Sequence, residues 1–443
     1  MRLALPITVG QLAIVGMTIT DIIIAGRTST DDLAGVALGG TIVNLAIMLV
    51  VGIVLGNGPI IGQLYGAGNF GAVRRQLQNC LWLCLPLGLL CTSLVSIGML
   101  ALPRLDINEH VANVTVRYLL PMLGTALLLP FMMALRTTFE GMGQARPAMA
   151  FNLIGFLANI PLDYALVLGK WGLPALGGAG CGWASFIVCL FIVAGEAWYA
   201  RYANALRNYR LLIPSGRIDL DMIKETLRIG LPVGGAILSE GGFFMLIPLL
   251  IAHMGAVVVS GHTVAISFDW AMFMIPMGIS QAISVLCAHE MGRQNPAIAR
   301  RICFTGLGLT ACIALIQAAF VIIFRDPIAA LFSADPAVRE LASHLLIYAA
   351  AFRVFDAINV GANGALRGYK DTRITVILAF TGYWIIGFPL SYSLALTEFW
   401  GTPLGVEGFW VGMVITLILI SCLAGTRLNQ TSRKALLAIN NQP

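Results

Sequence analysis

Long apolar runs separated by short polar segments make up nearly all of the chain. Each run holds about 20 residues or more, which is enough for a helix to cross the hydrocarbon of a membrane. The pattern therefore predicts an all-α integral membrane protein with twelve transmembrane helices. They are expected at 5–25, 33–57, 78–102, 116–138, 147–169, 179–199, 229–252, 257–287, 303–324, 341–365, 374–397 and 404–425.

The apolar pattern also occurs twice. The sequence around Pro6 resembles that around Pro232, and PLDY (161–164) aligns with PLSY (389–392) when the two copies are compared. Six spans in each copy make both copies enter the membrane from the same side, which is a parallel repeat. This predicts an N-terminal six-helix lobe at 1–200, a cytoplasmic linker at 201–228 and a C-terminal six-helix lobe at 229–443. A cleft between two similar halves is typical of transporters.

Composition agrees with a membrane protein. The chain is 58% hydrophobic, its mean hydropathy is +0.87 and only 11% of its residues are charged, against about 25% in soluble domains. The net charge is +6, and the basic residues are scattered among the apolar spans instead of forming one patch, so we expect no nucleic-acid partner. The nine cysteines lie mostly in apolar runs without histidine partners, so we expect packing, no metal site and no cofactor.

The basic residues predict the orientation. Of the 27 lysines and arginines, 20 fall in or next to the segments on the N-terminal side of the membrane and one, Arg353, falls deep within a span. The other six are Arg27, Arg104, Arg117, Lys170, Arg325 and Arg339. Because cytoplasmic loops are enriched in Lys and Arg, both termini are expected in the cytoplasm.

Ionisable residues within the predicted spans are mostly acidic. Besides Arg353, we place six acids inside the spans: Asp21, Asp163, Glu196, Glu240, Asp269 and Asp356. Arg117, Arg136 and Glu407 lie within three residues of a span end and are assigned to the membrane surfaces. A charge within a membrane is costly unless it is paired or hydrated, so each requires an explanation. The excess of acids favours a cationic cargo, a coupling proton or a sodium ion.

Alternatives remain for several of these acids. Glu196 is expected to reach the interface near Arg201. Asp356 lies three residues after Arg353, so a purely structural ion pair is the alternative to a binding role. Asp269 could be either a site residue or a core polar group.

Asp21, Asp163 and Glu240 have no base within helical reach in the sequence. The ionised form of a carboxyl is unfavourable in an apolar site without a counter-charge. We therefore expect these three to carry a proton or bind a cation, with hydrogen-bonded structural acids as the alternative.

Four motifs resemble those of the multidrug and toxic compound extrusion (MATE) family, NorM-like branch. They are PxxxGQxxxxGxxxxD (6–21), GPIIGQLYGAG (58–68), GGAGCG (177–182) and DAINVGANGALRGYKDT (356–372). The resemblance spans essentially the whole chain. It implies two six-helix lobes in a V shape that export cationic, amphiphilic compounds, driven by inward flow of sodium or protons.

The resemblance also implies site residues. Glu240 and Asp356 resemble an acidic pair that binds the coupling cation, with sodium as one candidate. Asp269 is unusual for this branch, and we group it with them as a further acid of the second lobe. Asp21, Asn159 and Asp163 resemble a proton- or drug-binding group of the first lobe. The remaining positions are drug-contact candidates: Thr41, Asp335 and Phe273, the last departing from the aromatic hydroxyl often found there.

Two other functions remain as alternatives. A flippase for lipid-linked precursors would favour more basic residues in its cavity than the single Arg353. An intramembrane enzyme could use Asp21 and Asp163 as a pair, but the sequence shows no phosphate-binding loop, zinc helix or nucleophile elbow. We therefore expect a transporter, not an enzyme. It should be a monomer of the cell inner membrane whose partners are organic cations and lipids.

Overall fold

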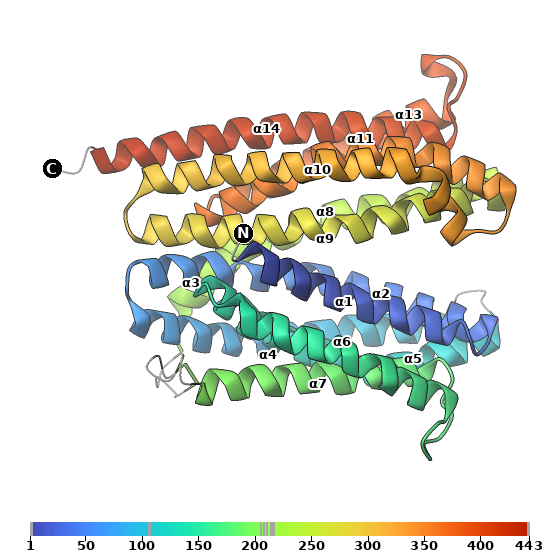
Figure 1. Cartoon of the computed structure of the whole chain (residues 1–443), viewed down its shortest axis with the longest axis horizontal. Helices are drawn as coiled ribbons and strands as arrows, with labels where there is room; N and C mark the ends of the chain where they lie inside the picture. Colours follow the sequence, from blue (N-terminus) through green and yellow to red (C-terminus); the bar gives the residue numbers. More distant parts are fainter. Residues whose placement is uncertain are drawn as a thin grey trace. The chain divides into compact units, whose positions relative to one another are not determined.

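The computed structural model describes residues 3–104, 108–203, 206, 209, 211–212 and 218–440, and side chains up to residue 438. The chain divides into two compact units, Met1–Gly234 and Gly235–Pro443. Figure 1 shows the chain as long helices throughout. Helix α8 begins in the first unit and ends in the second.

The first unit consists of seven helices and the start of an eighth among its described residues. They are α1 (Ala4–Ala25), α2 (Thr30–Leu55), α3 (Asn57–Gly66), α4 (Phe70–Ala101), α5 (Glu109–Gly141), α6 (Ala145–Leu168), α7 (Ala179–Tyr202) and α8 (Leu220–Ile251). A 3-10 turn at Leu102–Arg104 follows α4. Helices α2 and α3 together form one membrane-length segment, Thr30–Gly66.

The second unit continues from α8 through a 3-10 turn at Ala252–Met254. Its other helices are α9 (Ala256–Gly292), α10 (Pro296–Phe332), α11 (Pro336–Gly368), α12 (Arg373–Phe380), α13 (Phe388–Leu396) and α14 (Val406–Asn440). A π-helical segment, Thr381–Gly387, joins α12 to α13, and a 3-10 turn at Glu398–Trp400 follows α13. Helix α10 is kinked at Phe324.

The prediction of twelve membrane-length helices is confirmed within the described residues. Most helices extend beyond the apolar runs that predicted them, because polar residues at the ends continue or cap the helix. The side chain of Asn69, for example, accepts a hydrogen bond from Ala72 N and starts α4 eight residues before the expected position 78.

Four of the 20 basic residues that predicted a cytoplasmic N-terminal side lie outside the described residues: Arg2, Arg207, Arg210 and Arg217.

The duplication is visible in the backbone. Leu176 N donates to Leu166 O at 2.9 Å, and 228 residues later Leu404 N donates to Leu394 O at 3.0 Å. Left-handed backbone also recurs after matching helices, at Gly68 (φ 70°) and Gln294 (φ 61°). The two copies therefore share loop geometry that their side chains alone do not reveal.

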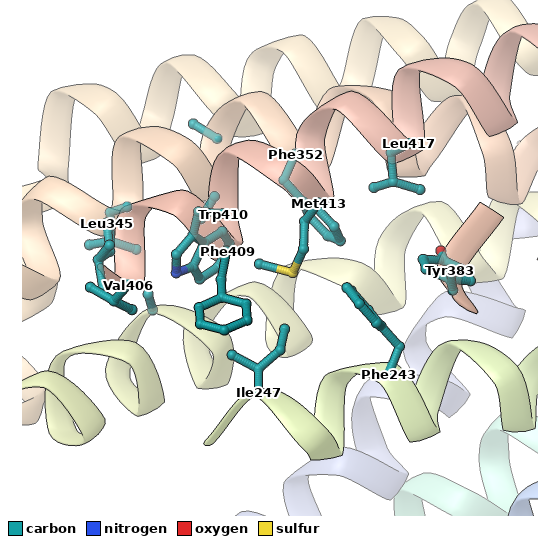
Figure 2. Packing of buried hydrophobic residues seen from close by; sticks show 14 of the residues in the cluster. Phe243, Ile247, Leu345, Phe352, Tyr383, Val406, Phe409, Trp410, Met413 and Leu417 are labelled. Carbon is teal, nitrogen blue, oxygen red and sulfur yellow. The ribbon is translucent and has the colours of Figure 1, made fainter. Parts of the chain in front are cut away.

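Each unit has its own apolar core. Ile61, Leu77 and Phe139 contribute to a cluster in the first unit. In the second unit, Figure 2 shows Phe243 and Ile247 of α8 close to Phe409 and Met413 of α14. Between membrane-spanning helices, such side chains stabilise the bundle through van der Waals contacts.

Candidate ion- and substrate-binding sites

In the first unit, three helices bring polar side chains to one buried point, which we call the first-unit site. Asp21 comes from α1, Asn159 and Asp163 from α6, and Cys181 and Ser185 from α7. Asn159 Nδ2 donates to Asp21 Oδ1 at 3.3 Å, and Ser185 Oγ donates to Asp21 Oδ2 at 2.9 Å. The structure thus brings together the three residues that the sequence grouped in the first lobe.

Helical spacing explains this convergence. Asn159 and Asp163 are four residues apart on α6, and Cys181 and Ser185 are four apart on α7, so each pair shares a helix face. The Cys181 thiol donates to the backbone oxygen of Asp21 at 3.5 Å, which fixes α7 against α1 at this level.

The carboxyl groups at this point lack a counter-charge. Asp163 is fully buried, and neither of its oxygens has a hydrogen-bond partner among the described residues. Within the same part of the chain, no salt bridge joins Asp21 or Asp163 to a base. One oxygen from each carboxyl and Cys181 Sγ all lie within 4.8 Å of one another. Two carboxylates this close cannot both remain ionised without a proton or a cation between them.

A second polar group lies in the other unit and is built around Arg353 of α11, which we call the second-unit site. Arg353 Nε donates to Asp269 Oδ1 at 2.9 Å, and its Nη2 forms an ion pair with Asp269 Oδ2. Nη1 donates to Asp356 Oδ2 at 2.7 Å. The expected Arg353–Asp356 pair is therefore present, and the sequence missed that Asp269 from α9 completes it.

Glu240 of α8 lies within electrostatic reach of Asp356 and Arg353, with the Tyr383 phenol beside it. Asp356 Oδ1 has no hydrogen-bond partner among the described residues. Three acids thus surround one guanidinium, leaving two negative charges unbalanced if all three ionise. Tyr383 belongs to the π-helical segment, a local geometry often found at functional sites.

The three drug-contact candidates occupy different surroundings. The Phe273 ring lies 5.4 Å from the Arg353 guanidinium carbon, so it forms part of the second-unit site. Thr41 is exposed, and its hydroxyl bonds to Ala37 O of its own helix. Asp335 caps the start of α11 by accepting from Ala337 N. It lies about 30 Å along that helix from Asp356, given the 1.5 Å rise per residue.

The expectation that Glu196 reaches the membrane interface near Arg201 is wrong. Glu196 is fully buried in α7 and lies within electrostatic reach of Arg136 of α5. Arg136 Nε in turn binds Glu140 Oε1 at 2.8 Å, and both of these side chains are buried. Arg136, which the sequence analysis placed with the cytoplasmic segments, is therefore a second buried base. Glu196 and Arg136 are buried because α5 packs on α7. A hydropathy profile along the sequence cannot predict this contact between two helices.

Sequence reasoning also missed Ser185 and Tyr383, and treated Cys181 as packing. For Ser185 and Cys181 a signal was available, because they are four residues apart and share one face of α7 within its apolar first half. Tyr383 could not be located, since the π-helical segment shifts the register of the residues that follow its start.

A duplicated bundle of membrane-length helices with a buried acidic group in each half defines a membrane transport protein. The MatE family model matches residues 6–165 and 232–393. These segments exceed half of the chain, so the chain belongs to the MatE family. Proteins of this family are transporters and not enzymes, and they require no cofactor.

Curated relatives are similar over nearly the full length. The multidrug resistance protein PmpM of Pseudomonas aeruginosa is 36% identical over 437 residues, covering 98% of this chain and 91% of the relative. The multidrug resistance protein MdtK of Yersinia enterocolitica is 34% identical over 429 residues, covering 97% and 94%.

The fold has solved counterparts. The outward-facing structure of a multidrug resistance MATE family transporter matches with a TM-score of 0.85, covering 98% of this chain and 95% of that chain. Its sequence identity is 20%, so this likeness concerns the fold alone.

Proposed function

We propose that this chain is a multidrug efflux antiporter that exports cationic, amphiphilic compounds in exchange for protons or sodium ions. The observation that carries the proposal is the excess of buried acid in both sites. Asp21 and Asp163 have no ion-pair partner among the described residues, and Arg353 balances only one of the three acids around it. The full-length relatives named multidrug resistance proteins support the drug-export part.

Each site is proposed to exchange its cation during transport. In the first-unit site, Asp21 and Asp163, with Asn159 beside them, hold a proton or the charged end of a drug. In the second-unit site, Glu240 and Asp356 hold the coupling ion, a sodium ion or a proton, with Asp269 fixing Arg353 beside them. A cation bound between two carboxylates relieves their mutual repulsion, which couples ion binding to the state of the site.

The proposed setting follows from sequence. The protein would be a monomer in the cell inner membrane, with both termini in the cytoplasm as the distribution of Lys and Arg favours. Lobes at 1–200 and 229–443, joined by a linker at 201–228, would move relative to each other during transport. Its partners would be small organic cations and the surrounding lipids.

A flippase for lipid-linked precursors is the second candidate. Its pyrophosphate cargo would require several unpaired bases, whereas Arg353 is neutralised by Asp269 and Asp356. Arg136 is likewise bound to Glu140 and lies near Glu196. The acidic character of both sites therefore favours a cationic cargo.

Expression in a host lacking its own drug pumps tests the proposal. Cells carrying the wild-type chain should tolerate higher concentrations of ethidium and fluoroquinolone-like compounds, and should lose preloaded ethidium faster. A chain with Asp356→Asn, present in the membrane at equal abundance, provides the matched control. Equal tolerance in cells with the wild-type chain, the variant and the empty vector would contradict export of organic cations.

A further inference from the structure

The thiol in the first-unit site changes what cation that site can hold. Cys181 Sγ, a carboxyl oxygen of Asp21 and one of Asp163 lie within 4.8 Å of one another, and all three residues are buried. Ligands of a tetrahedral zinc ion are about 3.5 Å apart, given metal–ligand distances of about 2.0–2.3 Å. Side-chain movements of about 1 Å would therefore bring these three ligand atoms to the separations found in a zinc site.

A second observation points to a missing ligand. Both oxygens of Asp163 and Oδ1 of Asn159 are buried and without a hydrogen-bond partner among the described residues. Buried polar atoms are normally satisfied, so unpartnered atoms at one point indicate an unfilled binding position. Asp163 supplies one member of the three-residue cluster, and the amide oxygen of Asn159 beside it could supply a fourth ligand.

The duplicated half provides an internal comparison. With the offsets of 226 for α1 and 228 for α6 and α7, Asp21, Asp163 and Cys181 match Ile247, Ser391 and Phe409. Figure 2 shows Ile247 and Phe409 packed within the apolar core of the second unit. Ser391 is buried there as a neutral hydroxyl. The fold thus accepts one small polar and two apolar side chains at this position, and it does not require three metal-ligating groups in the first unit.

We propose that Asp21, Asp163 and Cys181 form a binding site for a thiophilic divalent cation, Zn²⁺ or Cd²⁺. Sulfur favours these metals, whereas Mg²⁺ and Ca²⁺ prefer oxygen ligands alone. The metal replaces the proton on Cys181 Sγ and any proton shared by the two carboxyls, and those protons pass to the medium. No oxidation takes place, and binding weakens as the pH falls because protons compete with the metal.

Asp21 is already oriented for this role. Asn159 and Ser185 each donate one hydrogen bond to its carboxylate, which leaves further lone pairs for a metal. Such outer contacts fix the direction of a ligating carboxylate and raise metal affinity.

The test measures equilibrium metal binding to the purified protein in detergent, in a background with the exposed Cys312 and Cys422 changed to Ser. Zn²⁺ affinity is obtained by competition with a coloured chelator, and Cd²⁺ binding is followed by the ultraviolet absorption of the cadmium–thiolate bond. We expect one bound metal, with Cys181→Ser and Asp163→Asn each weakening Zn²⁺ binding by about 10- to 100-fold. Asp163→Asn should also reduce the cadmium–thiolate absorption although the thiol is kept.

Two controls separate this site from other thiols. Cys189→Ser changes a second buried cysteine of the same helix and should leave binding unchanged. The double change Cys80→Ser, Cys84→Ser removes a pair of buried thiols in α4. The proposal is overturned if the wild-type protein binds no Zn²⁺, if Cys181→Ser binds it normally, or if the binding is lost with Cys80 and Cys84 instead.

Folding of the variants is checked by helix content and by gel filtration. In Cys181→Ser the hydroxyl can replace the thiol as donor to Asp21 O, so the variant should fold. The measurement uses neither a drug nor an ion gradient. Failure to bind metal would therefore contradict the metal site without contradicting drug export, and failure of export would not contradict the metal site.

Discussion

Arg353 is buried and depends on two acids from different helices. Its guanidinium binds Asp269 of α9 through both the side chain and the backbone oxygen, and Asp356 of its own helix. Removing one partner from a buried ion pair typically costs about 3–5 kcal/mol, because the remaining charge is uncompensated. The sequence predicted the Arg353–Asp356 pair within α11 from its spacing. The contact with Asp269, 84 residues before Arg353, depends on the packing of α9 against α11 and could not be predicted from spacing.

Arg353→Met should therefore lower the thermal stability of the protein in detergent by a large step. In a second variant, Arg353→Met with Asp269→Asn, less negative charge is left unpaired. It should be less destabilised than the sum of the two single changes. The measurement is the unfolding midpoint of Arg353→Met, Asp269→Asn and the double variant, each compared with wild type. Simple additivity would show that Arg353 and Asp269 do not stabilise each other.

Asp163→Asn should act in the opposite direction on stability. The wild-type carboxyl lies near Asp21 with both oxygens unpartnered among the described residues, whereas the amide can donate a hydrogen bond to Asp21 worth about 1 kcal/mol. We expect a raised unfolding midpoint together with loss of drug export. A variant that is less stable than wild type would indicate that Asp163 has a structural role.

Asp21→Asn tests the carboxylate pair from the other side. With Asp21 neutral, no second carboxylate remains to share a proton or a cation with Asp163, so export should be impaired more than folding. Changing the external pH should not restore it, because the ionisable group itself is gone. Ethidium efflux measured across the pH range is the readout, and normal efflux would remove Asp21 from the mechanism.

At the scale of the helix, the start of α8 and the residue before it are bonded to α4 within the first unit. Gln76 Nε2 donates to Thr226 Oγ1 at 2.8 Å, and Asn79 Oδ1 accepts from Asp219 N at 2.7 Å. At Gly230 the backbone of α8 meets that of α2, and an added Cβ would lie 2.6 Å from the Cα of Ile53. This contact requires glycine.

Gly230→Ala should accordingly separate α2 from α8 and lower the stability by about 1–3 kcal/mol, the usual cost of overpacking. Gly425→Ala in α14 is the matched control, since nothing lies within 4 Å of its added Cβ. The control should be neutral or slightly stabilising because alanine favours helix. Thermal unfolding in detergent measures both. Equal effects at the two positions would contradict a close helix contact at Gly230.

Helix positions were predictable from the sequence because twenty consecutive apolar residues have few alternatives to a membrane-spanning helix. The ends were less predictable, as at Asn69, where a cap extends α4 through polar residues. The π-helical segment at Thr381–Gly387 was not predictable, because nothing in the apolar pattern marks an extra residue in one turn.

At the scale of the whole chain, the duplication provides the transporter fold and the two halves differ in chemistry. Asp21 and Asp163 match Ile247 and Ser391 in the second half, and Asp356, in turn, matches Leu129 in the first, with an offset of 227. Each half therefore holds its acids at positions where the other half has none. The sequence predicted the acids of both sites, whereas the partners Ser185 and Tyr383 emerged from packing.

The most direct test of the proposed antiport is uphill export by purified protein in liposomes, with pH and sodium gradients imposed separately. We expect at least one gradient to drive an organic cation such as ethidium against its concentration difference. Asp163→Asn and Asp356→Asn should each abolish this uphill movement while inserting normally. Uphill export that persists with both acids replaced would contradict the claim that the buried carboxylates couple ion flow to drug export.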